Sequence, residues 1–581
     1  MLSVEASKVV NANLTNRRWL RTGWDLVSAV VIALLGFWHA SSLRWLSDDA
    51  FASFRYARNW ARGLGLVFNA HERVEGITNP LWTLGLGVLS RYGFEIQDMA
   101  IGAGIAAYVG CALCLLRACD FPKERRGDWL IPVGALLVVS DPDWATFATG
   151  GLETSAFSLS VLSSYLLAWE VKDLRRAGAL AGLAAAITGM LRPDGALFVL
   201  PLALSFWGKR RRGLGSYLAV SLLLLGTFHV WRHNYYGSWL PNTYYAKSAL
   251  VSWWSQGLVY LGYFAFRHAA VIGLAGAFSL AVLFSAAAKR RDARPSAAAS
   301  LSHPLVVVWI MILVYVLSIV RVGGDFMYAR LLVPVLPLLA LAFQKSLGCV
   351  LGTRPLAYSL VGGIVAVVTF VWPCPVDTDI VAHHGIVDER AYYQSGFADT
   401  IDYWANHLRQ CIRGYPVRAA IYGGELRLAY SAQIPYAIEA HAGLTDPVIA
   451  HKPIGTRQRV GHEKSADASY LVLTKKAHFA TSPLYGVLSD MNGFIPDVHA
   501  DLCGVDVRLL HWDPAFVSFV RARGARVPEF TKWLDAVLMH LDGMPDSWVR
   551  TQFDAVQHFY FAHNADPARE QVFLRRLGQV H

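Results

Sequence analysis

Long apolar runs alternate with short polar and basic stretches along the first 372 residues. The first run, Leu26 to Leu43, approaches the roughly 20 residues that cross a bilayer as a helix. Ten more follow, several of them shorter than a full crossing: Met99 to Leu116, Trp129 to Ser140, Ala156 to Trp169, Ala177 to Leu191, Ala196 to Trp207, Leu214 to Val230, Val271 to Ala288, Pro304 to Val320, Leu331 to Phe343 and Leu356 to Trp372. The pattern predicts an α-helical polytopic membrane protein with about eleven transmembrane helices.

Basic clusters between these runs predict which loops face the cytoplasm. Arginines at 17, 18 and 21 precede the first run, and an excess of Lys and Arg marks cytoplasmic loops. The later clusters are Lys123 to Arg126, Lys172 to Arg176, Lys209 to Arg212, Lys289 to Arg294, and Lys345 with Arg354. One membrane crossing is needed between Leu43 and the cytoplasmic cluster at Lys123, and Met99 to Leu116 provides it. The short apolar run Leu81 to Ser90 is therefore expected to be a juxtamembrane or re-entrant segment. We expect a protein of the cytoplasmic (inner) membrane whose tail is extracytoplasmic.

Composition supports the membrane class and argues against nucleic acid. The chain is 54% hydrophobic and 16% charged, whereas soluble proteins carry about 25% charged residues. The net charge of +11 is divided among short clusters between apolar runs, which is typical of cytoplasmic loops and not of a nucleic-acid-binding face. Membrane lipids are therefore the expected surroundings.

The polar motifs all fall in the loops predicted to face outward. These loops are Asp48 to Asn79, Asp141 to Thr154, Arg192 to Gly195, Trp231 to Lys247, and Arg321 to Arg330. No Gly-x-x-x-x-Gly-Lys-Ser/Thr run is present in the sequence, and the outer compartment lacks nucleotides. Chemistry on this face therefore needs a donor other than a nucleotide sugar.

Several of these motifs, in this order, resemble a known family. The matching stretches are Asp48 to Asn59, Gly63 to Asn69, Glu72 to Trp82, Gly150 to Thr154, Arg192 to Gly195, Tyr235 to Lys247, Gly323 to Arg330, Gly443 to Asp446 and Gly461 to Lys464. Together they look like polyprenyl-phosphate-sugar glycosyltransferases of the GT-C fold. Within that group the chain is most similar to the terminal arabinofuranosyltransferases of the mycobacterial cell wall, and the resemblance covers nearly the whole chain.

The resemblance implies transfer of arabinofuranose from a lipid-linked sugar donor, decaprenyl- or undecaprenyl-phosphoryl arabinofuranose, to a glycan or protein acceptor, and a monomer is expected. Because no second carboxylate motif in the sequence demands a covalent intermediate, direct displacement with inversion is predicted. The motifs are specific for the family but do not determine which sugar is transferred. Another pentose, an aminosugar or a hexose such as mannose is therefore an alternative. A non-catalytic membrane transporter is a further alternative. It would place polar residues within its spans and on both sides of the membrane, whereas here they collect on one face.

Two adjacent acids directly after the first apolar run are the strongest candidates for catalysis. Ser47 is a plausible N-cap, which places Asp48 and Asp49 in the first turn of a short interfacial helix. A helix N-terminus stabilises carboxylate anions, and an ionised carboxylate can accept a proton from an acceptor hydroxyl. The resemblance implies that Asp48 is the base and that Asp49 orients it or binds the acceptor. The structural alternative is that both residues only cap the helix.

Cations and polar side chains in the other outward loops are candidates for substrate binding. A lipid phosphate needs charge-assisted partners, and Lys247, Arg330, Arg192 and Arg232 lie in these loops, although each of them could instead snorkel to lipid headgroups. Sugar or acceptor groups could be held by Glu153, Asp194, Asn242, Tyr244, Tyr245, Asp325, Glu75 and His462. The alternative for Glu153, Asp194, Asn242 and Asp325 is that they tie loops to helix ends, and the alternative for the two tyrosines is an interfacial belt. The histidines lack metal-site spacing, so no zinc site is predicted. A divalent cation bound by Asp48 and Asp49 stays open.

The chain divides into a transmembrane domain over residues 1–372, with a first outer loop at 44–80, and an extracytoplasmic domain over 373–581. The second domain is expected to be a mixed α/β cap, with strands at Val417 to Tyr422 and Ser469 to Thr474 and an amphipathic helix at Phe530 to Leu541. Its cysteines lie in an oxidising compartment if the predicted sidedness is right, and a disulfide between Cys411 and Cys503 is favoured.

Overall fold

The computed structural model describes residues 25–118, 131–247, 251–288, 301, 303–351, 354–423, 426–455, 457, 459–482 and 494–579. The chain forms two compact units that alternate along the sequence. The helical unit comprises Met1–Ala50, Thr78–Trp239 and Val251–Tyr392, and the α/β unit comprises Phe51–Ile77, Leu240–Leu250 and Tyr393–His581. The boundary predicted at residue 372 stays a prediction. The basic clusters at 17–21, 123–126 and 289–294 lie outside the described residues.

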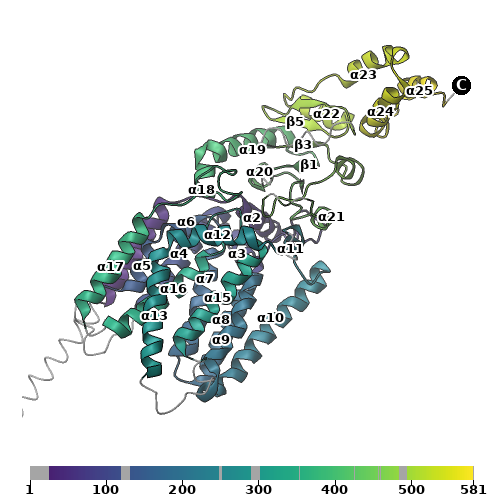
Figure 1. The fold of residues 1–581 in the computed structure, drawn as a ribbon. Helices are drawn as coiled ribbons and strands as arrows, with labels where there is room; N and C mark the ends of the chain where they lie inside the picture. The colour runs from purple at the N-terminus through teal and green to yellow at the C-terminus, as the bar shows by residue number, and fades with distance from the viewer. Residues whose placement is uncertain are drawn as a thin grey trace, which may run out of the picture. The chain divides into compact units, whose positions relative to one another are not determined.

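Each of the eleven apolar runs contains helix. The helical unit is built from Asp25–Ser42, α3 (Pro80–Arg91), α4 (Ile96–Arg117), α5 (Val133–Ser140), α6 (Pro142–Thr149), α7 (Thr154–Glu170), α8 (Leu174–Leu191), α9 (Val199–Ala203), α10 (Leu214–Tyr236), α12 (Trp254–Arg267), α13 (Ala269–Ala288), α15 (Pro304–Val322), α16 (Leu336–Leu351) and α17 (Pro355–Val371) (Figure 1). The run from Ala196 to Trp207 is broken into α9 and short 3₁₀ turns. Leu81 to Ser90 lies in α3, and its place in the membrane stays a prediction.

Six of the described helices are long and apolar enough to cross a membrane, as a polytopic membrane protein requires. They are Asp25–Ser42, Ile96–Arg117, Arg210–Tyr236, Ala269–Ala286, Pro304–Val322 and Val333–Leu351. The helices of the other runs are not among these six, and some of them, such as Pro355–Val371, are shorter, so the count of eleven spans stays a prediction. Small residues bring neighbouring helices together: a Cβ on Gly182 of α8 would lie 2.7 Å from the backbone oxygen of Tyr217 in α10.

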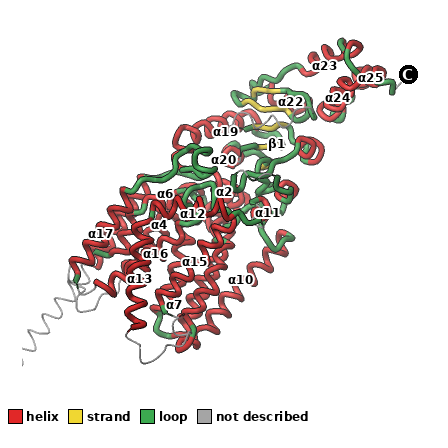
Figure 2. Tube along the Cα trace, in the orientation of Figure 1, coloured by secondary structure: helices red, strands yellow, loops and turns green. Residues whose placement is uncertain are grey.

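The α/β unit contains a five-stranded mixed sheet in the order β2-β1-β3-β5-β4. Figure 2 draws its strands in yellow. The strands are β1 (Arg418–Ile421), β2 (Tyr436–Glu439), β3 (Phe479–Thr481), β4 (His499–Asp501) and β5 (Asp506–Leu509). β1 pairs in parallel with β2 and β3, whereas β5 pairs antiparallel with β3 and β4. The helices of this unit include α11 (Asn242–Ala246), α19 (Ala398–Ile412), α20 (Leu426–Ser431), α21 (Pro447–Ala450), α22 (Pro514–Arg521), α23 (Phe530–Met539), α24 (Asp546–Val556) and α25 (Pro567–Arg576).

The structure confirms three local predictions for this unit and corrects one. A strand forms within Val417 to Tyr422, a helix forms within Phe530 to Leu541, and Cys411 is bonded to Cys503. The strand predicted at Ser469 to Thr474 is wrong, because Tyr470–Thr474 is a π-helical turn. Its buried side chains, Leu471 and Val472, are adjacent in sequence, whereas a strand with one buried face would bury alternate residues.

Candidate functional site

Helix α2 (Asp48–Ala61) begins with the two predicted acids, as the sequence indicated. The segment before it is fixed by α6: the Trp45 indole donates to the Thr146 backbone oxygen at 2.9 Å, and the backbone N–H of Ser47 donates to the Gly150 oxygen at 3.0 Å. Figure 1 shows α6 and α12 at the end of the long helices where α2 starts. Asp48 is 4% exposed. The N-terminus of α2 therefore presents two carboxylates in a well-defined position.

Arg330 joins Asp49 to Asp325. Its Nη1 donates to Asp49 Oδ2 at 2.6 Å and its Nε donates to Asp325 Oδ2 at 2.5 Å. Asp325 and Arg330 are both buried, and the second oxygen of Asp325 accepts from the backbone N–H of Phe326 at 3.0 Å. Burial lowers the pKa of Arg330, but the Asp325 and Asp49 carboxylates outweigh it and raise that pKa above its ordinary value. We call Asp48, Asp49, Asp325 and Arg330 the α2 carboxylate group.

A second charged group forms around Arg192, which follows α8. Its guanidinium donates twice to Asp194, at 3.0 and 2.8 Å, and its Nη1 lies 3.4 Å from Glu153 Oε1. The Asn79 amide donates to the other oxygen of Glu153 at 2.6 Å, and the Tyr315 hydroxyl donates to Asp194 at 3.1 Å. The structure thus brings together three predicted site residues and adds Asn79 and Tyr315, which the sequence analysis did not single out.

A third group at the start of α6 was missed from the sequence. The His268 Nε2 lies 3.0 Å from Asp141 Oδ2, and Arg267 Nε donates to Asp143 Oδ1 at 3.0 Å. Burial lowers the pKa of His268, but the Asp141 carboxylate outweighs it and raises that pKa above its ordinary value. Ligand atoms of Asp141, Asp143 and His268 lie within 4.8 Å of one another, close enough for a cation, although Arg267 already balances Asp143. In the sequence, the two acids on either side of Pro142 were the signal that could have indicated this group.

The remaining predicted residues belong to none of these three groups. Arg232 is buried on α10, with its guanidinium 6.0 Å from the centre of the Phe228 ring. In the α/β unit, the Asn242 side chain donates to the backbone oxygens of Gly443 and Leu444, both at 2.8 Å, and the Asn242 backbone N–H donates to the Glu75 oxygen at 3.0 Å. Asn242 therefore ties two loops together, the structural alternative considered above.

Aromatic and basic side chains surround those loops of the α/β unit. The Tyr245 ring stacks on His451 at 4.2 Å between ring centres and lies edge-on to Tyr244. The His462 ring lies 5.5 Å from His441, and the side chain of Lys247 lies beside Gly461. Lys247 therefore lies next to the Gly461 to Lys464 motif within the α/β unit.

The helical unit therefore has the character of a polytopic membrane protein that carries buried charged groups outside its apolar helices. No protein-family model matches the chain. It is similar to two curated proteins, each named terminal β-(1→2)-arabinofuranosyltransferase. The one from Corynebacterium glutamicum is 26% identical over 398 residues, covering 63% of this chain and 58% of that protein. The one from Mycobacterium tuberculosis is 31% identical over 348 residues, covering 54% of each.

These relatives confirm the resemblance found in the sequence, and the chain spans little more than half of their length. Two solved structures are also similar. ArnT from Cupriavidus metallidurans bound to undecaprenyl phosphate has a TM-score of 0.47 at 14% identity, over 74% of this chain and 88% of ArnT. AglB from Archaeoglobus fulgidus in complex with an inhibitory peptide and a dolichol-phosphate has a TM-score of 0.46 at 12% identity, over 84% of this chain and 74% of AglB.

Proposed function

We propose that this protein is an inverting glycosyltransferase that transfers arabinofuranose from a polyprenyl-phosphate donor to a glycan or protein acceptor on the outer face of the cytoplasmic membrane. The names of the two curated relatives support the sugar and the reaction class. The observation that carries the proposal is the α2 carboxylate group, in which two acids occupy the first turn of α2 and Arg330 holds one of them.

In the proposed reaction, Asp48 accepts the proton of an acceptor hydroxyl as its oxygen attacks the anomeric carbon. The bond between that carbon and the donor phosphate oxygen breaks, and polyprenyl phosphate leaves with the electron pair. A single displacement inverts the configuration. Arg330 holds Asp49 and Asp325 in place. We assign the proton transfer to Asp48 because it is the first acid of α2, the position that the family resemblance indicates for the base.

The donor phosphate requires positive partners, for which we propose Lys247, Arg192, Arg232 and Arg330. A guanidinium has five N–H groups, so Arg330 can keep its two carboxylates while another N–H donates to a phosphate oxygen. Glu153, Asp194, Asp325, Glu75, Asn242, Tyr244, Tyr245 and His462 remain candidates for sugar or acceptor hydroxyls. No divalent cation is required by this scheme.

Reconstitution tests the function directly. Purified protein in lipid nanodiscs should transfer sugar from decaprenyl-phosphoryl arabinofuranose to an arabinofuranosyl oligosaccharide without added nucleotide, and NMR of the product should show inversion. Transfer from a nucleotide sugar alone, or retention of configuration, would remove the proposal. Offering polyprenyl-phosphoryl mannose and other pentoses in parallel decides between arabinofuranose and the alternative sugars.

The location of the reaction is tested separately. We propose that residues 373–581 lie outside the cytoplasm, because the predicted basic loops fall on the opposite face. An alkaline phosphatase fusion after Trp372 should be active, and one within Lys209 to Arg212 should be inactive. The reverse result would overturn the topology.

A further inference from the structure

A cavity of about 520 Å³ lies beside the open edge of the sheet in the α/β unit. This volume falls within the range of about 300–1,000 Å³ that is usual for small-ligand sites. Its walls include His499 and Asp501 from β4, Asp506 from β5, and Arg521, Arg526 and Val527 from the segment that follows β5. None of these residues belongs to the groups described above, so the proposed reaction leaves the cavity without a role.

The local strand pairing explains why the cavity exists. The backbone N–H of Asp501 donates to the Arg526 oxygen at 2.9 Å, and the N–H of Arg526 donates back to the Asp501 oxygen at 2.8 Å. An antiparallel ladder would next pair His499 with Pro528. Proline has no N–H to donate, so the ladder stops after one bridge. The chain separates there, and the edge of β4 at His499 becomes part of the cavity wall.

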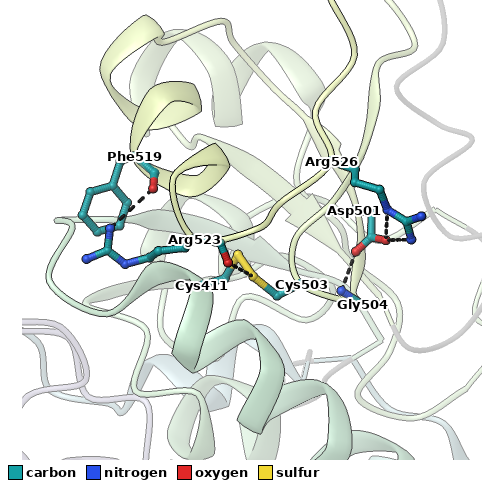
Figure 3. Close-up of a disulfide and its surroundings, with 7 residues drawn as sticks. All are labelled: Cys411, Asp501, Cys503, Gly504, Phe519, Arg523 and Arg526. Atoms are coloured by element: carbon teal, nitrogen blue, oxygen red, sulfur yellow. Dashed lines mark hydrogen bonds and ion pairs between the residues drawn. A yellow bond between two sulfur atoms is a disulfide. The ribbon is translucent and has the colours of Figure 1, made fainter.

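The walls are held rigidly. The disulfide between Cys411 and Cys503 ties the turn after β4 to helix α19, and the Asp501 carboxylate accepts hydrogen bonds from the Gly504 N–H and from Arg526 (Figure 3). Arg521 Nη2 donates to the backbone oxygens of Val527 and Pro528 at 2.8 and 3.1 Å. A site whose walls are fixed before binding loses less entropy when a ligand enters.

The charges of the lining indicate the class of ligand. Two aspartates and two arginines line the cavity, and these side chains already have partners: Arg526 pairs with Asp501, Arg521 lies 3.1 Å from Glu529, and Asp506 lies 3.1 Å from His499. An anion or a cation would have to compete with these ion pairs. Among the residues that the structure describes, the lining contains no Phe, Tyr or Trp side chain on which a planar ligand could stack. Closely spaced donors and acceptors that already have partners suit a neutral ligand rich in hydroxyl groups.

We propose that this cavity binds the glycan chain of the acceptor, at a subsite separate from the α2 carboxylate group. The inference rests on the proposed function for the identity of the glycan. Asp501 and Asp506 accept hydrogen bonds from sugar hydroxyls. Arg521 and Arg526 donate to sugar oxygens through the guanidinium N–H groups that do not take part in their ion pairs. The subsite raises the affinity for acceptors of several sugar residues without taking part in the chemistry.

Binding of an arabinofuranosyl hexasaccharide to the full-length protein in nanodiscs, measured by calorimetry without donor, tests the subsite. Asp506→Ala removes a wall carboxylate and should weaken binding about fivefold, the effect of one lost hydrogen bond. Val527→Trp fills the cavity and should abolish binding at this subsite. Asp542→Ala removes a fully exposed carboxylate outside the lining and serves as the matched control, with an unchanged Kd. Thermal unfolding and an intact disulfide confirm that each variant is folded.

The outcomes separate the two proposals. If the protein transfers arabinofuranose but Val527→Trp and Asp506→Ala bind the hexasaccharide as the parent does, the subsite is wrong and the function stands. If the hexasaccharide binds and both variants weaken it while no transfer occurs from any polyprenyl-phosphoryl sugar, the subsite stands and the function is wrong. With both correct, Asp506→Ala raises the KM for the hexasaccharide and leaves the KM for the donor unchanged.

Discussion

Arginine–aspartate pairs occur in both units, but in opposite surroundings. In the helical unit, the Arg330 and Asp325 side chains are 7% and 4% exposed, whereas in the α/β unit those of Arg526 and Asp501 are 85% and 28% exposed. Removing one partner of a buried pair leaves an uncompensated charge and costs about 3–5 kcal/mol, whereas an exposed pair contributes about 0–1 kcal/mol. The same two residue types therefore fix the position of a proposed active site in one unit and form part of the wall of an exposed cavity in the other.

The largest expected effect is at Arg330. Arg330→Ala leaves the buried Asp325 and the partly buried Asp49 without their shared cation, so it should lower stability by about 3–5 kcal/mol and abolish transfer. Thermal unfolding in detergent and the reconstituted transfer assay measure the two effects. Arg330→Lys keeps the charge but cannot span both carboxylates in the same way, and it should be intermediate in both assays.

Arg526→Ala is the matched control for that variant. It should change stability by less than about 1 kcal/mol. Equal losses for Arg330→Ala and Arg526→Ala would show that burial does not distinguish the two pairs, and the comparison between the units would fail.

The disulfide should give the next largest effect. Cys411 and Cys503 are 92 residues apart, and closing a loop of this size restricts the unfolded chain enough to stabilise the fold by about 2–5 kcal/mol. Cys503→Ser should therefore lower the unfolding temperature of the α/β unit. Cys374→Ser, at a cysteine outside any disulfide, should leave it unchanged. Loss of stability only in the Cys374 variant would contradict the assignment.

A smaller effect should appear on acidification. Burial, helped by the neighbouring His478 and His563, lowers the pKa of His511 from 6.5 to about 4. Between these values the unfolded chain binds a proton at His511 that the folded chain does not, so stability falls as the pH drops from about 6.5 towards 4. His511→Gln should flatten this part of the stability profile. An unchanged profile in the variant would show that His511 does not titrate as described.

Local patterns predicted the helices well, because each depends on neighbouring residues. Apolar runs gave helices throughout the helical unit, and the Asp48-Asp49 pair begins α2 as its position after Ser47 indicated. The π-helical turn at Tyr470–Thr474 was missed because a short apolar run fits either a strand or a buried turn. Only packing against the rest of the unit decides between the two.

The composition of the charged groups could not be predicted, because it depends on pairs far apart in the chain. Arg330 and Asp49 are separated by 281 positions, and Arg330 was expected at the donor phosphate without its carboxylate partners. His268 reaches Asp141 across 127 positions, and no local pattern connects them. The residue type and loop of Arg330 marked it as a candidate site residue. The partners that determine its role are seen only in the folded structure.

The central claim is that Asp48 is the base of a sugar transfer from a lipid phosphate. The most direct measurement is single-turnover transfer from decaprenyl-phosphoryl arabinofuranose by Asp48→Asn, with Asp98→Asn, an exposed acid of α4, as the control. We expect the Asp48 variant to keep the parent's unfolding temperature and donor affinity and to lose transfer by at least about a hundredfold, the usual contribution of a general base. Transfer by Asp48→Asn at a rate near that of the parent protein would contradict the account.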